Sequence, residues 1–395
     1  MGLPTALLLA KSGNSVKGYD IDKRKIQLLQ NKKLPFEEPG LERLFQQAMH
    51  NFHASDTLEP SDVFIITVPT PLTQEKTCDL SFVLSAVDAV KDVLQDENLV
   101  VLESTVPPGT TSEIVKPLLD ETLKHYFLSY VSEKAIPGNT IHEMRMNHRI
   151  IGGIDQESAE RTEEVYAHFV ESTIHLTDTK TAETVKLIEN TYRDINIALA
   201  NELAKRLSAQ DIDAWAAIKL ANFHPRVNVH QPGPGVGGHC IPIDPWFLDS
   251  DDTCLMKQAR KINDSMPSYV VGLAETLIQE KDNPIIVILG VSYKGDVDDT
   301  RESPSYTIKK ICEEKGMRVR LYDPLVKHNP EVLTDLFMAT KDADCLILVT
   351  DHSMFKDIDP CSIVNMHQKN IVDTRNMLEY EKWIHAGFNV EILGK

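Results

Sequence analysis

The sequence predicts an α/β protein in which two parallel-sheet domains flank a helical middle. Short apolar strands alternate with helices from residue 15 to residue 153 and again from residue 284 onward, as in βαβ units. Residues 178–212 contain no Gly and no Pro, which indicates one long helix between the two alternating regions. A chain of 395 residues also exceeds the size of a single hydrophobic core, so several domains are expected.

The individual elements follow from runs of apolar residues and from the Gly, Pro and Asp residues that end them. The apolar first ten residues predict the start of a helix, and a charged helix is expected from Asp22. Strands are predicted within 15–20, 61–71, 98–111, 149–153, 284–296, 317–324, 342–351 and 369–374. Further helices are predicted at 79–95, at 252–282 and, with about 30 residues, from 178. The expected domains are 1–177, 178–282 and 283–395.

Composition and charge exclude several classes of function. The formal net charge of −18 argues against a nucleic-acid surface, which requires a basic field. No apolar run reaches the roughly 18 residues of a membrane span. The six cysteines are scattered without CxxC or metal-ligand spacing, which predicts reduced thiols in a cytosolic protein and no metal site.

The opening residues carry the end of a dinucleotide-binding pattern. In a Rossmann fold, a strand, a G-x-G-x-x-G turn, a helix and then an acidic residue hold the cofactor. Here Gly2 precedes a helix and Asp20 ends the next strand, but the first strand and the first two glycines are missing. Gly2 and Asp20 therefore also read as a plain helix start and strand end. The turns VPTP (68–71) and ESTVPPG (103–109) follow parallel strands, where α/β sheets bind ligands.

A single thiol stands on an unusual loop, PGPGVGGHCIPIDPWF, at 232–247. Glycines let a backbone approach a ligand closely and prolines fix its turns, so the loop suits a reactive Cys240 better than a packed core does. The alternative is that Cys240 is a small buried apolar residue. A nucleophilic thiolate needs a nearby cation, and Asp244 would oppose its formation. Asp244 is therefore expected to handle a proton or to position water.

Lys186 and Asn190 lie four residues apart on the expected long helix and share one face. Asn and Thr are poor helix formers, so ENTY at 189–192 in a helix interior suggests a task for Asn190. A Lys and Asn pair can stabilise an oxyanion by charge and hydrogen bond. The alternative is that both side chains are solvated helix positions.

Six stretches of the chain resemble, in order, the UDP-glucose/GDP-mannose dehydrogenase family. They are GLPTALLLA, VPTP, ESTVPPGTT, KLIENTYRDINIALANELA, HPRVNVHQPGPGVGGHCIPIDP and GVSYKGDVDDTRESPS. The resemblance implies two Rossmann-like domains, a homodimer through the long helix, and an NAD-dependent oxidation of the C6 alcohol of a UDP-sugar to a carboxylate. Cys240 would trap the intermediate aldehyde as a thiohemiacetal, and a second oxidation would give a thioester that water hydrolyses.

The same resemblance implies roles for further residues. Lys186 and Asn190 would stabilise oxyanions, and Asp244 would assist with a proton or water. Thr105 would hold that water or the substrate hydroxyl, and Glu133 would act as the base for thioester hydrolysis. The residues expected to hold NAD are Gly2, Asp20, Lys25, Thr70, Thr105 and Arg301. Those expected to hold the UDP-sugar are Arg226, Asn228, Gly235 and Lys294.

Two departures from the family pattern bear on this expectation. The missing first strand and glycine pair would remove the pyrophosphate cradle, so the chain either begins at an internal Met of a longer protein or is a truncated relative. SEK stands at 132–134 where PER is usual, and the Arg to Lys change loses a planar fork.

The resemblance, closest in ENTYRDINIALANEL and HPRVNVHQPGPGVGGHC, implies UDP-N-acetylmannosamine as the substrate, oxidised to a uronic acid for surface polysaccharide. UDP-glucose or another UDP-hexose is the alternative substrate. A truncated, non-catalytic nucleotide-sugar binder is the alternative from another class of protein. A simple hydroxyacid dehydrogenase is disfavoured, because a single hydride step has no use for the Cys240 loop.

Overall fold

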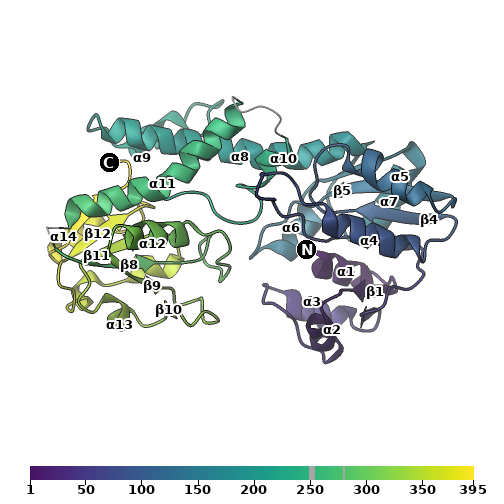
Figure 1. Ribbon diagram of the computed structural model, residues 1–395, viewed down its shortest axis with the longest axis horizontal. Coiled ribbons are helices and arrows are strands. Elements are labelled where there is room, and N and C mark those ends of the chain that lie inside the picture. Colours follow the sequence, from purple (N-terminus) through teal and green to yellow (C-terminus); the bar gives the residue numbers. More distant parts are fainter. Residues whose placement is uncertain (249–253, 279–280) are drawn as a thin grey trace. The chain divides into compact units, whose positions relative to one another are not determined.

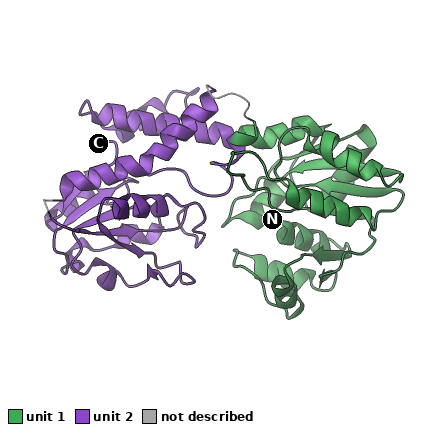
Figure 2. Cartoon of the chain, viewed as in Figure 1, with its two compact units in different colours: residues 1–189, 246–248 green, residues 190–245, 249–395 purple. Residues whose placement is uncertain are grey.

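The computed structural model describes residues 1–248, 254–278 and 281–395, and the chain forms two compact units (Figure 2). Unit 1 comprises residues 1–189 and 246–248, and unit 2 comprises residues 190–245 and 249–395. None of the helices in the described ranges is both long enough and apolar enough to cross a membrane.

Unit 1 contains two separate sheets. The smaller one pairs β1 (Val16–Tyr19) in parallel with β2 (Phe52–Ser55). The larger one, in spatial order, consists of β3 (Val63–Ile66), β4 (Asn98–Leu102), β5 (Tyr126–Ser132), β6 (Arg149–Gly153) and β7 (Ile174–Asp178). All its pairs are parallel except β5 with β6, which is antiparallel. Within the described ranges β1 pairs only with β2, and β3 only with β4, as expected of a Rossmann sheet without its central first strand.

Helices cover these sheets and form the core with them. They are α1 (Gly2–Lys11), α2 (Lys23–Gln30), α3 (Leu41–Ala48), α4 (Ser81–Lys91), α5 (Lys116–Asp120), α6 (Thr140–Met146) and α7 (Gln156–Tyr166). Asp22 and Asp155 cap α2 and α7, because their carboxylates accept hydrogen bonds from the N–H groups of Arg24 and Ser158. The apolar opening residues form α1, as predicted, and Leu7 is fully buried there.

The long helix is α8 (Thr179–Ser208), which has 30 residues and passes from unit 1 into unit 2 (Figure 1). Asp178 starts it: the carboxylate accepts from the N–H of Thr181 at 2.9 Å and from the Thr181 hydroxyl at 2.6 Å. The lack of Gly and Pro lets the helix continue. Its prediction from the sequence is confirmed.

The described residues of unit 2 form one parallel sheet of six strands. In spatial order these are β10 (Val332–Leu333), β9 (Arg318–Tyr322), β8 (Ile285–Leu289), β11 (Cys345–Leu348), β12 (Asn370–Asp373) and β13 (Asn389–Ile392). Its other helices are α9 (Ala214–Ala221), α11 (Leu255–Leu277), α12 (Pro304–Glu314), α13 (Leu336–Thr340) and α14 (Tyr380–His385). Every residue of β8 is buried, as the continuous apolar run predicts. The predicted α/β class, with parallel sheets and a helical region between them, is confirmed.

Candidate active site

Cys240 is an exposed residue on a partly buried loop whose glycines allow close packing. A Cβ at Gly237 would lie 2.5 Å from the carbonyl oxygen of Glu302. Gly238 has a φ of +88°, and its Cβ position is 3.0 Å from the ring of Tyr293. Both positions therefore need glycine. The Cys240 residue itself is exposed, which excludes the alternative of a cysteine packed in a core.

The chain turns immediately after Cys240. The Cys240 carbonyl accepts hydrogen bonds from the N–H groups of Ile243 at 3.1 Å and Asp244 at 2.9 Å, and α10 (Asp244–Phe247) begins there. Asp244 is buried, and its Oδ2 accepts from Nδ2 of Asn190 at 2.6 Å. The structure thus brings together two predicted catalytic residues, one on the loop and one on α8. Asn190 is itself buried, so it is not a solvated helix position.

A charged pair borders the Cys240 loop in unit 2. Nε and Nη2 of Arg301 donate to the two carboxylate oxygens of Asp299 at 2.8 and 2.6 Å. This pairing raises the pKa of Arg301, and the negative charge of an ionised Cys240 adds to that shift. Burial and then the charge of Arg301 lower the pKa of His239. Arg301, predicted to hold cofactor phosphates, therefore also lies near the thiol, with its charge paired to Asp299.

The residues predicted to bind the UDP-sugar lie in three places of unit 2. Arg226 and Asn228 are exposed in the segment after α9, and the Asn228 carbonyl accepts from Nδ2 of Asn196 at 2.9 Å. Gly235 has a φ of +129° and packs against two prolines. Lys294 is half-buried in the loop that follows β8. This loop lies at the carboxyl end of a parallel strand, where nucleotide-binding sheets hold their ligands.

The residues predicted to hold NAD in unit 1 fit that cofactor. A Cβ at Gly2 would lie 2.3 Å from Oγ1 of Thr67, so the start of α1 needs a residue without a side chain. Asp20 follows β1, and its side chain is 40% exposed. Its oxygens accept from the N–H of Asp22 at 2.8 Å and pair with Nζ of Lys25 at 3.2 Å. A half-exposed carboxylate at this strand end suits the ribose hydroxyls of NAD and repels a 2′-phosphate.

The other predicted residues of unit 1 follow its strands or lie on α8. Oγ1 of Thr70 donates to the carbonyl of Thr105 at 2.6 Å, which joins the turns after β3 and β4. Glu133, just after β5, is buried, and its Oε1 accepts from the N–H of Ala135 at 2.5 Å. Lys186 is buried on α8, so it too is not a solvated position.

Lys134, which stands in SEK where arginine is usual, has an ion-pair partner in the structure. Lys134 forms an ion pair with Glu189 on α8, and the Lys134 side chain is 17% exposed. Lysine therefore provides a charge contact between this loop and the helix, without the planar fork that an arginine presents.

Sequence reasoning missed two buried carboxylates in unit 1. Oε1 of Glu183, one turn before Lys186 on α8, accepts from the N–H of Thr111 at 2.8 Å, and its Oε2 accepts from that of Gly109 at 2.6 Å. Glu103 follows β4 and accepts from the hydroxyl of Tyr166 at 2.5 Å. Burial raises the pKa of both carboxyls. The available signal for Glu183 was its position on the helix face that carries Lys186.

Comparison with known proteins gives the class of the chain. Models of the UDP-glucose/GDP-mannose dehydrogenase family match residues 1–170 (NAD binding domain), 180–265 (central domain) and 287–380 (UDP binding domain). The chain therefore belongs to this family. It is an NAD-dependent UDP-sugar dehydrogenase, as the resemblance of its motifs predicted.

Three individual relatives show high similarity over the whole chain. A UDP-N-acetyl-D-mannosamine dehydrogenase of Methanococcus aeolicus is 44% identical over 407 residues, covering 100% of this chain and 93% of the relative. The UDP-D-ManNAc dehydrogenase structure from Pyrococcus horikoshii is 38% identical with a TM-score of 0.93, covering 100% of this chain and 96% of that one. The native UDP-N-acetyl-mannosamine dehydrogenase structure from Staphylococcus aureus is 38% identical with a TM-score of 0.90, at the same coverage.

Proposed function

We propose that this enzyme oxidises the C6 alcohol of UDP-N-acetylmannosamine to the carboxylate through a thioester on Cys240, in the cytosol, for surface polysaccharide. The observation that carries the proposal is the exposed thiol on a glycine loop, with Asp244 held by Asn190 and with Arg301 nearby. The names of the relatives support the choice of sugar.

The alcohol would reach the carboxylate level in two oxidations, and bound NAD would accept one hydride in each. C6 first loses a hydride and its hydroxyl loses a proton, which gives the aldehyde. Sγ of Cys240 then bonds to C6, and the thiol proton ends on the aldehyde oxygen. Loss of the second hydride from C6 and of that hydroxyl proton gives the thioester. Water adds to C6, the C–S bond breaks, the thiol is restored, and the carboxylate leaves.

Each step asks for a residue that this chain provides. The Lys186 ammonium and the second N–H of the Asn190 amide would stabilise the oxygen on C6 when it is negative. Asp244 would orient a water or carry its proton, because Asn190 fixes its carboxylate. In unit 1, Thr105 would hold the substrate hydroxyl or water, and Glu133 would be the base for hydrolysis. The predicted domains at 1–177, 178–282 and 283–395 would divide cofactor binding, the thiol and UDP binding.

The proposal includes a homodimer through the helical region. In unit 2, Tyr192 and Leu199 on α8 and Leu220 and Phe223 around α9 are 47–74% exposed. Large exposed apolar side chains of this kind favour an interface with a second copy. The exposed Arg226 would reach the diphosphate of the partner's substrate. Light scattering at micromolar concentration should give twice the chain mass, and a monomer mass would contradict the dimer.

The experiment that tests the sugar is a comparison of kcat/KM on UDP-N-acetylmannosamine, UDP-glucose and UDP-N-acetylglucosamine, with NAD in excess. We expect UDP-N-acetylmannosamine to be preferred by at least about tenfold, the discrimination that one well-placed polar contact provides. A higher kcat/KM on UDP-glucose would show that UDP-glucose, and not UDP-N-acetylmannosamine, is the substrate. If the chain binds the UDP-sugar but does not bind NAD, it is a nucleotide-sugar binder and not an enzyme.

A further inference from the structure

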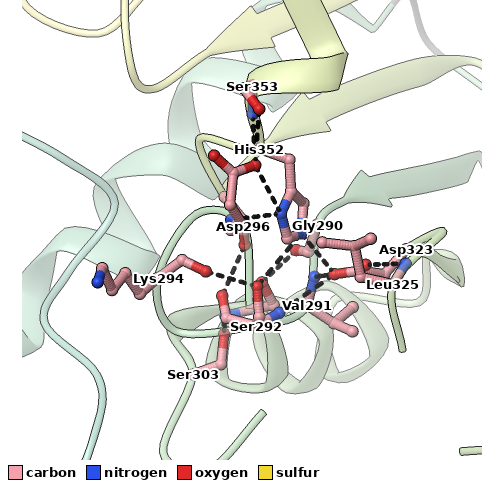
Figure 3. Close-up of polar contacts among 12 residues, drawn as sticks. Gly290, Val291, Ser292, Lys294, Asp296, Ser303, Asp323, Leu325, His352 and Ser353 are labelled. Carbon is pink, nitrogen blue, oxygen red and sulfur yellow. Dashed lines mark hydrogen bonds and ion pairs between the residues drawn. The ribbon is translucent and has the colours of Figure 1, made fainter. Parts of the chain in front are cut away.

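A buried polar network lies at the carboxyl ends of three adjacent strands in unit 2, β9, β8 and β11 (Figure 3). Its centre is His352, which follows β11 and is fully buried. Asp323 follows β9 and is fully buried as well. Between them runs the loop of residues 291–296 after β8, which carries Lys294. The proposed mechanism gives neither His352 nor Asp323 a role.

The imidazole has one hydrogen-bond partner on Nδ1 and two on Nε2. Nδ1 accepts from the N–H of Asp296 at 2.9 Å, so Nδ1 carries no proton. Nε2 therefore carries it and lies 3.0 Å from Oδ2 of Asp323 and 3.2 Å from Oγ of Ser292. The Ser292 hydroxyl donates to the carbonyl of Lys294 at 2.8 Å, so toward His352 it acts as the acceptor. These contacts define a neutral imidazole with its proton on Nε2.

Asp323 holds the beginning of the same loop. Its Oδ2 accepts from the N–H groups of Val291 at 2.8 Å and Ser292 at 3.3 Å, and its Oδ1 accepts from that of Leu325 at 3.0 Å. Burial alone would raise the pKa of Asp323, but the bond from His352 and those from the backbone hold it below its usual value. The carboxylate therefore stays charged and keeps accepting these bonds.

The two side chains thus grip both ends of one loop. Asp323 fixes Val291 and Ser292, His352 fixes Asp296, and Ser292 fixes the carbonyl of Lys294 between them. Figure 3 shows the amino end of Lys294 directed away from this network. We propose that His352 is a positioning residue of the nucleotide-sugar site, which acts with Asp323 to place Lys294 for the UDP-sugar. The inference rests on the proposed function, because it takes Lys294 to bind that substrate.

Two substitutions separate the bonds of His352. In His352→Asn, the amide oxygen takes the place of Nδ1 and can still accept from the N–H of Asp296. In His352→Gln, the amide nitrogen takes the place of Nε2 and can still donate to Asp323, but the N–H of Asp296 loses its acceptor. Asn is the smaller side chain and leaves the larger void beside Phe355, whose ring lies 5.1 Å from that of His352. A packing role therefore ranks Asn as the worse variant, and a positioning role that acts through the N–H of Asp296 ranks Gln as the worse one.

The test is calorimetric titration of the full chain with UDP-N-acetylmannosamine. We expect His352→Gln to weaken binding about tenfold, the effect of one lost hydrogen bond to a buried group, and His352→Asn to stay close to the unmodified chain. Lys294→Ala should weaken binding too, and adding His352→Gln to it should cost little more, because both act through Lys294. Should His352→Gln not fold, Ser292→Ala takes its place in this double-mutant cycle.

The outcomes distinguish the two claims. If the unmodified chain does not bind the UDP-sugar, the proposed function fails and the inference falls with it. If the chain binds it and Lys294→Ala weakens binding, the proposed role of Lys294 stands. The positioning role is then overturned by His352→Asn binding worse than His352→Gln, or by additive losses in the double variant.

Discussion

Unit 2 holds thiols in two opposite environments. Cys312 on α12 and Cys345 on β11 are fully buried in the core of the six-stranded sheet. Burial raises the pKa of both thiols, to about 12 for Cys312. Cys240 is exposed on a glycine loop, near the paired Arg301 and Asp299. Burial thus separates the cysteines that pack in the core from the one that is accessible to react.

The largest expected effect comes from Cys240→Ser. A serine hydroxyl stays protonated without a strong base, so no thioester forms and acid production should fall by roughly 10³-fold or more. The measurement is the rate of carboxylate formation. Cys361→Ser is the matched control, because Cys361 is also exposed but lies outside the loop. If Cys240→Ser still converts the sugar fully to the acid, Cys240 is not the reactive thiol, and the comparison with the buried cysteines fails.

Lys186→Ala should have the next largest effect. Loss of a charge that stabilises an oxyanion should lower kcat about 10²- to 10³-fold while the Kd of the UDP-sugar stays nearly constant. Steady-state kinetics and calorimetry measure the two quantities. Lys205→Ala is the control, since Lys205 lies on the same helix and donates to Ser265 at 3.0 Å. Equal losses in kcat and affinity would make Lys186 a binding residue.

Asp244→Asn should act on the release of the product. The amide cannot take a proton, so hydrolysis should slow about 10²-fold and a thioester on Cys240 should accumulate. Intact-protein mass spectrometry after mixing with substrate and NAD would detect the added UDP-sugar mass. Asp264→Asn is the control, because Asp264 pairs with Arg260 on α11. If Asp244→Asn hydrolyses the thioester as fast as Asp264→Asn and accumulates no adduct, Asp244 has no part in the mechanism.

The smallest effect is expected in the core. Cys345→Ala removes a buried sulfur atom from β11 and should lower the free energy of unfolding by about 1 kcal/mol, with kcat unchanged. Urea unfolding and the standard assay measure the two quantities. A large loss of kcat without a loss of stability would show that this buried thiol takes part in the reaction.

Much of the fold could be predicted from sequence patterns. β8 and α8 are read from a continuous apolar run and from a stretch without helix breakers. Three strands of unit 1 were missed, namely β2, β5 and β7. β2 has only four residues and a mixed burial pattern, and β5 carries serine and tyrosine among its apolar residues. Such runs lack a clear period, so their place in a sheet depends on neighbours distant in sequence.

The candidate site was predicted unevenly for a similar reason. Cys240 and Asp244 stand on one loop, and the loop composition singles them out. The bond from Asn190 to Asp244 joins residues 54 positions apart, and no local pattern announces it. His352 and Asp323 are 29 positions apart and meet only because β9, β8 and β11 are neighbours in the sheet. Residues that position other side chains or loops through such long-range contacts are not marked by a local sequence motif.

The count of NADH formed per UDP-N-acetylmannosamine consumed tests the central claim most directly. It should be made with the chain as printed, and with the chain preceded by a strand and glycine turn of the Rossmann pattern. We expect two NADH and one UDP-linked carboxylate per sugar in the version that turns over. One NADH per sugar with release of the aldehyde, or no NADH from either version, would contradict it.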